Sequence, residues 1–277
     1  MNYIDAHSHI WTPDTQKYPL GPGHRRAQME PPSFTVEELK AEMKAVGVAR
    51  VVLIQMSFYG YDNSYMLDAI ANNPGMFRGV AVIEQDKGDP APQMLELKKR
   101  GVSGFRIYPK DRNFDGWLAS DTMHAMFRTA AKERLNMCCL MDPNGLPALD
   151  RMCRQYPETP VVIDHLCRIG VTGQIPPTDV QALCDMARHP QLTVKVSAFY
   201  ALGKKVPPYT DLAPFIKQVL DAFGRERLMW ASDGPYQMQP PHSYKASLEL
   251  IQSGLDYLTA NDREWLLRKT AEKVFFA

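Results

Sequence analysis

The sequence predicts one α/β domain spanning residues 1–277, folded as a (β/α)8 barrel. Short apolar, β-branched runs recur eight times along the chain and alternate with stretches of helical periodicity. Some runs, such as 51–54 and 161–163, are hydrophobic at every position, which is typical of parallel strands buried on both faces. The length of 277 residues also suits one such barrel, which usually has roughly 250 residues.

The predicted strands occupy residues 3–10, 50–56, 78–83, 104–108, 137–141, 161–165, 192–197 and 228–231. Eight strands with helical crossovers are the number that closes such a barrel. An open, doubly wound sheet is the competing arrangement, and it is disfavoured because no Gly-rich phosphate-binding loop follows the first run. Residues 12–33 are rich in proline and glycine, so we expect a long loop after strand one that folds over the barrel mouth.

Three of the connecting segments carry signals of helix ends. Thr35 and Glu38 have the spacing of a capping box, and Gly47 is expected to end the helix that they begin. By the same kind of signal, a second helix is expected to open at Thr178 and a third at Asp211.

The composition disfavours several functional classes. The 32 basic and 31 acidic residues give a formal net charge of +1, which argues against nucleic acid or an anionic membrane as the main partner. No apolar stretch approaches the roughly 18 residues of a membrane span. The five cysteines include no Cys-x-x-Cys pair, and the first strand is too polar for a signal peptide. We therefore expect a cytoplasmic protein with reduced thiols that acts on a small molecule.

Polar residues stand at or near the C-terminal ends of the predicted strands, where barrels of this kind carry their chemistry. In chain order they are His7, His9, Gln55, Glu84, Arg106, Asp142, His165, Lys195, Ser197 and Asp233. Side chains two apart on a strand share a face, so His7 and His9 are expected to point the same way. Two converging imidazoles can bind a metal ion or donate hydrogen bonds to a polarised carbonyl.

Several of these residues also have structural interpretations. Asp142 precedes a Pro-Asn-Gly segment and is expected to be a turn or cap residue. Lys195 lies inside a strand, where it either pairs with a core carboxylate such as Asp5 or takes part in catalysis. Glu84 begins a polar segment and is either a solvated loop acid or part of the site. The histidines expected to be structural are His24, His124 and His189, whereas the role of His242, after strand eight, stays open.

Arg106 has fewer structural explanations. A guanidinium within an apolar strand requires an anionic partner, and a substrate carboxylate fits as well as an internal one. The nearby loop cations Lys110, Arg112 and Arg168 are of a kind that is usually solvated. We therefore expect Arg106 to bind a carboxylate-bearing substrate.

Three motifs, taken together and in order, carry a resemblance to a known family. They are His7-x-His9 on strand one, Asp164-His165 within Ile-Asp-His-Leu on strand six, and Trp-Ala-Ser-Asp-Gly-Pro-Tyr at 230–236 on strand eight. The chain resembles the amidohydrolase superfamily, and within it the amidohydrolase-related branch that includes 2-pyrone-4,6-dicarboxylate lactonase and the sugar lactonases. Further matching segments lie at 104–106, 145–149, 194–197, 223–230 and 269–275, so the resemblance covers nearly the whole chain.

This resemblance implies a barrel of the metal-dependent hydrolase type and an enzyme that attacks a small lactone, ester or amide carbonyl with water. Asp233 stands at the position of the aspartate that takes the proton from that water, and His165 matches the strand-six histidine. His7 and His9 match the strand-one pair, which faces the substrate or, together with Asp233, binds a divalent metal, usually zinc.

The chain departs from the fuller family pattern at strand five, which ends Cys139-Leu140-Met141-Asp142 where metal-binding relatives commonly place a histidine. No candidate for a carboxylated lysine ends strand four, so a two-metal site is not expected. One metal held by His7, His9 and Asp233, and a site without metal, remain equally open. The alternative function is a metal-dependent non-oxidative decarboxylase of the same superfamily, which the missing histidine disfavours. A non-catalytic binding barrel is disfavoured by the three polar motifs.

Overall fold

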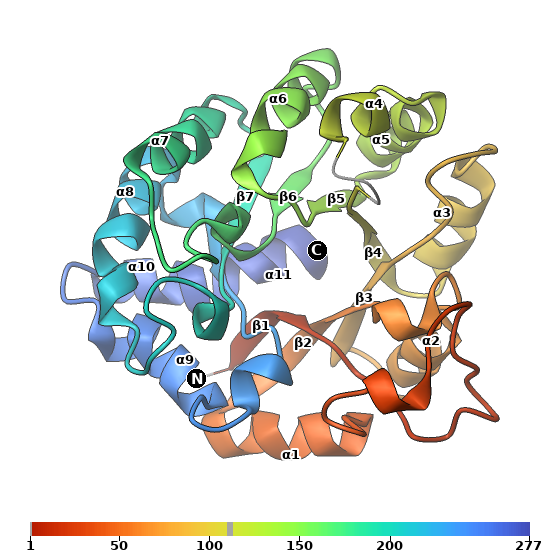
Figure 1. Cartoon of the computed structure of the whole chain (residues 1–277), viewed down its shortest axis with the longest axis horizontal. Coiled ribbons are helices and arrows are strands. Elements are labelled where there is room, and N and C mark those ends of the chain that lie inside the picture. The colour runs from red at the N-terminus through yellow and green to blue at the C-terminus, as the bar shows by residue number, and fades with distance from the viewer. Residues whose placement is uncertain (1, 110–112) are drawn as a thin grey trace.

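The computed structural model describes residues 2–109 and 113–277, so the predicted loop cations Lys110 and Arg112 lie outside the described residues. Eight parallel strands form one sheet in sequence order, and helices surround it (Figure 1). The strands are β1 Tyr3–Ser8, β2 Val48–Ile54, β3 Phe77–Ala81, β4 Val102–Ile107, β5 Asn136–Cys139, β6 Val161–Ile163, β7 Leu192–Val196 and β8 Leu228–Trp230. The predicted (β/α)8 barrel is confirmed.

The barrel closes where β1 meets the residues that follow β8. A parallel bridge joins Ser8 to Gly234. On either side of it, the backbone N–H of Asp233 donates to the carbonyl of His7 at 2.8 Å, and that of His9 donates to the carbonyl of Gly234 at 2.8 Å. The closure therefore brings the histidine pair of strand one next to the aspartate of strand eight.

The helices pack outside the strands. They are α1 Val36–Val46, α2 Ser64–Asn72, α3 Ala91–Lys99, α4 Phe114–Leu118, α5 Asp121–Glu133, α6 Leu146–Gln155, α7 Pro177–Asp185, α8 Ala213–Phe223, α9 Tyr244–Glu249, α10 Ala260–Glu264 and α11 Thr270–Phe275. Two π-helical turns, η10 Leu250–Gly254 and η11 Trp265–Lys269, continue α9 and α10. Within the described residues, no helix has the length and apolar character of a membrane span.

Short 3₁₀ turns occupy many of the connections. They are η1 Arg26–Gln28, η2 Ser57–Tyr59, η3 Pro143–Gly145, η4 His165–Arg168, η5 Met186–Arg188, η6 Phe199–Ala201, η7 Thr210–Leu212, η8 Arg225–Arg227 and η9 Tyr236–Met238.

One of the three predicted helix starts is confirmed in detail. Thr35 Oγ1 accepts from the Glu38 N–H at 3.3 Å, and Glu38 Oε2 accepts from the Thr35 N–H at 2.5 Å. The other two starts differ from the prediction by one and two residues. The second helix, α7, begins one residue before Thr178, with prolines supplying the fixed backbone of its first turn. Asp211 lies in η7, ahead of α8, and its carboxylate accepts from the Lys204 N–H at 2.8 Å.

The predicted strands run one or two residues too far at their C-terminal ends. β1 ends at Ser8, before His9, and β6 ends at Ile163, before His165. The chain stays buried beyond the last ladder residue because these segments form the floor of the barrel mouth, so the hydrophobic pattern does not mark the true strand end.

The C-terminal helix α11 lies behind the strands in Figure 1, across the opposite end of the barrel from the mouth. Ala271 and Phe275 of α11 join the apolar side chains that fill the barrel interior, among them Ile4 and Val162. The ring of Phe275 lies 5.3 Å from the ammonium of Lys195. This end of the barrel is therefore packed shut, which leaves the other end for chemistry.

The long loop after β1 is fastened along the rim of the mouth. Trp11 Nε1 donates to the carbonyl of Pro31 at 2.8 Å, and the Gly21 N–H donates to the carbonyl of Phe58 at 2.7 Å. Tyr18 Oη donates to Asp68 of α2 at 2.8 Å. The loop thus supports η2, which in turn borders the cavity described below.

Candidate active site

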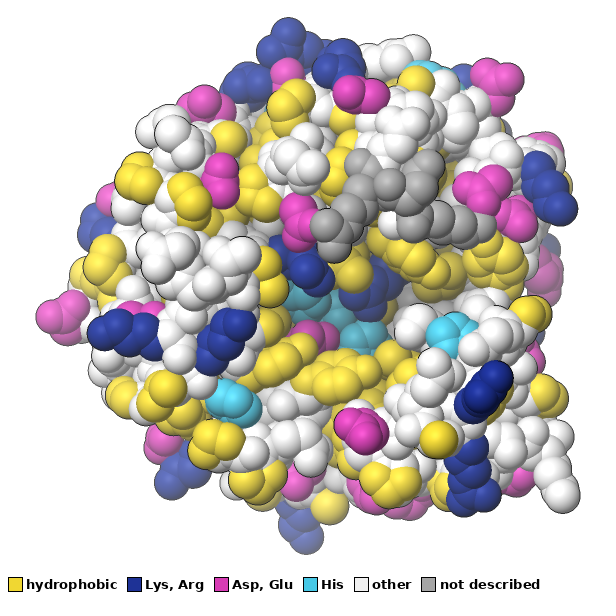
Figure 2. Space-filling view, in the orientation of Figure 1, with side chains coloured by type: hydrophobic (Ala, Val, Ile, Leu, Met, Phe, Trp, Pro, Cys, Tyr) yellow, Lys and Arg dark blue, Asp and Glu magenta, His cyan; other side chains and the backbone are white. Residues whose placement is uncertain are grey.

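A cavity of about 250 Å³ opens at the C-terminal mouth of the barrel. Figure 2 shows it as a hollow with histidine, acidic and basic side chains at its floor and hydrophobic side chains around them. The lining residues that bear on its chemistry are His9, Arg106, Tyr108, His165, Asp233 and Tyr236.

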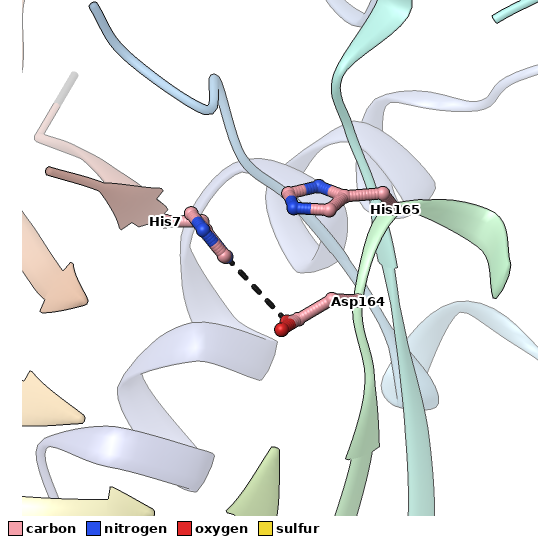
Figure 3. Close-up of side chains that lie close together, drawn as sticks. All are labelled: His7, Asp164 and His165. Atoms are coloured by element: carbon pink, nitrogen blue, oxygen red, sulfur yellow. Dashed lines mark ion pairs between the residues drawn. The ribbon is translucent and has the colours of Figure 1, made fainter. Parts of the chain in front are cut away.

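Three histidines surround one oxygen atom of Asp233. Its Oδ1 lies 3.3 Å from His7 Nε2, 3.3 Å from His9 Nε2 and 3.8 Å from His165 Nε2. The two strand-one histidines also approach each other, with 3.3 Å between their Nε2 atoms. Figure 3 shows the His7 and His165 rings side by side above Asp164. The structure therefore brings together the four residues that the sequence motifs singled out.

The backbone aims these side chains inward. Asp233 and His165 both adopt positive φ angles, 69° and 53°, three residues beyond the end of β8 and two beyond the end of β6. Such conformations are uncommon for residues with a Cβ atom, and they cluster at functional sites. His9 Nδ1 donates to the carbonyl of Ile54 at 3.0 Å, and His165 Nδ1 lies 2.9 Å from Ser197 Oγ. Both rings are thus fixed from behind.

Asp5 ties β1 to the segment after β8 beneath the site. Its carboxylate accepts from the Ser232 N–H at 2.8 Å, Ser232 Oγ at 2.5 Å, Tyr244 Oη at 2.8 Å and the His7 N–H at 3.0 Å. Complete burial raises the pKa of Asp5. Since these donors saturate its oxygens, Asp5 is not the partner of Lys195. The predicted pairing of Lys195 with a core carboxylate is confirmed, but the partner is Asp164.

Lys195 pairs instead with Asp164, at 2.9 Å between Nζ and Oδ1, and both side chains are fully buried. The ammonium also lies 3.2 Å from His7 Nδ1. Burial alone would raise the pKa of Asp164, but Lys195, His7 and His165 together outweigh it and hold that pKa well below the ordinary value. Burial and Lys195 together lower the pKa of His7, so its ring is neutral.

Asp233 is held as a carboxylate. Burial opposes its charge, but the neighbouring imidazoles, His165 foremost, lower its pKa below the ordinary 3.8. Tyr200 Oη donates to Asp233 Oδ2 at 2.8 Å, and burial and Asp233 raise the pKa of Tyr200. Tyr200 is not among the site residues predicted from the sequence, because a tyrosine three residues beyond Ser197 carries no motif. Its only signal is its place in the loop after strand seven.

Arg106 is half-buried and lines the cavity. Among the described residues, no carboxylate lies within ion-pair distance of its guanidinium. Arg168 also lines the cavity, but its Nε donates to Asp142 at 2.7 Å. Asp142 is the residue before η3, and its carbonyl accepts from the Gly145 N–H at 2.9 Å, so the predicted turn residue is confirmed, although its side chain makes no capping hydrogen bond.

The other polar candidates lie away from the reacting centre. Glu84 accepts from the N–H groups of Gln85 and Asp86 and does not border the cavity. Gln55 borders the cavity but donates to the carbonyl of Asp62 at 2.6 Å. The remaining histidines contact protein groups elsewhere. The ring of His24 packs against Phe58. Ring nitrogens of the other three lie within hydrogen-bond distance of Tyr156 (His124), Asp150 (His189) and Tyr209 (His242).

The side chains of His7, His9 and Asp233 form a candidate metal-ligand set. Their facing atoms lie 3.3 Å apart in each of the three pairs. A tetrahedron around zinc, with bonds of about 2.0 Å, has edges of about 3.3 Å. The spacing therefore fits one tetrahedral cation with an open fourth position.

Known proteins share this chain's sequence pattern and fold. The Amidohydrolase family profile matches residues 4–277. A 4-sulfomuconolactone hydrolase from Hydrogenophaga intermedia is 28% identical over 234 residues, which cover 84% of this chain and 74% of the relative. An L-fucono-1,5-lactonase from Burkholderia ambifaria is 25% identical over 240 residues, which cover 86% of this chain and 82% of the relative. The solved structure of a probable 2-pyrone-4,6-dicarboxylic acid hydrolase from Acinetobacter baumannii, with citric acid bound, is 24% identical with a TM-score of 0.81, covering 100% of both chains.

Proposed function

The chain belongs to the amidohydrolase family, and from this premise we propose that it hydrolyses a small, carboxylate-bearing lactone with Asp233 as the general base. One observation carries the proposal. An ionised, buried carboxylate faces three imidazoles on the floor of a cavity that also holds Arg106, which has no carboxylate partner among the described residues. The two curated relatives described above, which are a sulfomuconolactone hydrolase and a sugar lactonase, support a lactone as substrate.

Asp233 takes a proton from the attacking water. A general base must be ionised at the working pH and within hydrogen-bond reach of the water. The lowered pKa of Asp233 meets the first condition, and its place on the cavity wall meets the second. Tyr200 holds Oδ2, which leaves Oδ1 to face the histidines and the water.

The histidines and Arg106 orient the substrate. His165 and His9 both line the cavity. Because His9 gives its Nδ1 proton to the carbonyl of Ile54, His165 is the imidazole that donates toward the substrate carbonyl, where a donor stabilises the developing negative charge. A lactone carbonyl is more electrophilic than an unstrained amide, so a base and oriented donors suffice. Arg106 binds the carboxylate of the substrate, because a guanidinium forms paired hydrogen bonds with that group.

Zinc is the metal that the donor set fits, and His7, His9 and Asp233 would hold it. A bound zinc ion would polarise the carbonyl and make water more acidic. The roles of Arg106 and Tyr200 are the same with or without it, because neither belongs to the donor set.

Decarboxylation, the alternative, has less support. Strand β5 ends at Cys139 and offers no histidine to the mouth. The curated relatives described above are lactone hydrolases by name.

The test is a lactone panel assayed with a pH indicator, since each hydrolysis releases an acid. Asp233→Asn keeps the size of the side chain but not its basicity, so turnover should fall about 10²–10⁴-fold. The matched control is Asp115→Asn, on the exposed surface of α4. Near-native turnover by Asp233→Asn on a lactone that the wild type hydrolyses would refute the proposal. Treatment with a chelator, followed by added zinc, then decides the metal requirement. If the chelator abolishes activity and zinc restores it, the enzyme needs a metal; if the chelator leaves activity unchanged, the site works without one.

A further inference from the structure

The ammonium of Lys195 lies between two acceptors beneath the site. It is 2.9 Å from Asp164 Oδ1 and 3.2 Å from His7 Nδ1, while those two atoms are 3.5 Å apart (Figure 3 marks this last pair). A lysine ammonium has three donors and no lone pair. In the contact with His7, Nδ1 must therefore be the acceptor.

The other side of the His7 ring leads independently to the same assignment. His9 Nδ1 contacts the carbonyl of Ile54, which can only accept, so in the neutral His9 ring Nδ1 carries the proton and Nε2 carries the lone pair. His9 Nε2 lies 3.3 Å from His7 Nε2. A hydrogen bond between two nitrogens needs one proton, and in this pair only His7 can supply it.

We propose that Lys195, held by Asp164, is a positioning residue that keeps the single ring proton of His7 on Nε2. His7 is then a hydrogen-bond donor into the site, aimed at His9 and Asp233. The same proton occupies the position where His7 would bind a metal. The Lys195–Asp164 pair therefore weakens the affinity of the His7–His9–Asp233 set for zinc, although the spacing of that set fits the ion. The effect on metal affinity builds on the proposed site, whereas the proton position does not depend on its activity.

This arrangement differs from the usual support of a metal-binding histidine. Such a histidine donates its second ring N–H to a carboxylate or a carbonyl, which leaves the other nitrogen free for the metal. Here a carboxylate is present, but a cation stands between it and the ring. Removing the cation should let His7 Nδ1 donate to residue 164 and free Nε2 for zinc.

The proton position can be measured by 15N NMR of protein labelled at histidine, without substrate or metal. The chain has seven histidines, and His7→Gln identifies the His7 signals by their loss. Wild type should show the proton on Nε2. Lys195→Met should move it to Nδ1 and tighten zinc binding, measured by chelator competition, by about 10–100-fold, the range that such outer contacts command.

Lys195→Met leaves Asp164 buried without its partner, which can prevent folding. The double variant Lys195→Met/Asp164→Asn removes both charges, and its amide oxygen can still accept from His7. Lys205→Met, which removes an exposed lysine, is the matched control and should change neither readout. A wild-type proton on Nδ1, or an unchanged or weaker zinc affinity in both Lys195 variants, would overturn the proposal. If neither variant folds, the wild-type spectrum alone decides it.

Discussion

Arg106 offers a direct test of substrate class, because it is the cavity arginine without a carboxylate partner among the described residues. A hydrogen bond to a charged group contributes about 1.5–3 kcal/mol. Since each 1.4 kcal/mol is a factor of ten, Arg106→Ala should lower kcat/KM for a carboxylated lactone by about 10- to 100-fold. Most of the loss should appear in KM, since the carboxylate is bound equally in the ground and transition states.

The assay compares two lactones that differ only in the carboxylate. With the uncharged lactone, Arg106→Ala should retain nearly all of its kcat/KM. Arg106→Lys keeps the charge but not the paired geometry, and it should fall between wild type and Arg106→Ala on the charged lactone. Equal losses on both lactones, with unchanged thermal stability, would show that Arg106 shapes the barrel mouth and does not recognise an anion.

Three further outcomes follow from the contacts. Tyr200→Phe should lower kcat by about 10-fold or more with little change in KM, because it removes the hydroxyl that orients Asp233; an unchanged kcat would contradict this. Phe275→Ala should reduce the free energy of unfolding in urea by about 3–5 kcal/mol, and the more exposed Phe276→Ala by clearly less. Asp150→Asn should destabilise the protein at neutral pH, because burial opposes the Asp150 charge but His189 and nearby arginines outweigh it and lower its pKa. The ionised Asp150 contributes its full stabilisation at pH values above 3.8, the ordinary pKa of an aspartate. The difference in free energy of unfolding between wild type and Asp150→Asn should therefore shrink as the pH falls below 3.8.

The fold was predictable because buried parallel strands carry their own pattern. All eight runs, including the three-residue strands β6 and β8, are strands in the structure. Their C-terminal ends were not predictable, since burial continues into the loops that hold His9 and His165. Hydrophobicity reports burial, whereas the end of a strand is set by where backbone hydrogen bonding stops.

The convergence of His7, His9, His165 and Asp233 followed from simple rules about strand ends and alternating faces. The same rules could not identify the acidic partner of Lys195. Asp5 and Asp164 are both acids beside inward-facing strand positions, and the choice depends on which oxygens other donors already occupy. Those donors, Ser232 and Tyr244, come from the far end of the chain, and no spacing rule connects them to Asp5.

The barrel interior places its charges in layers, and this order accounts for the state of the base. Phe275 closes the lower end, Lys195 lies above it, and Asp164 forms an ion pair with that ammonium inside the protein. Lys195 is therefore not the partner of Asp233, which faces three imidazoles and the hydroxyl of Tyr200. Among the described residues no lysine or arginine forms an ion pair with Asp233, and its carboxylate can accept a proton from water. A direct ion pair between Lys195 and Asp233 would stabilise the carboxylate further but weaken it as a base.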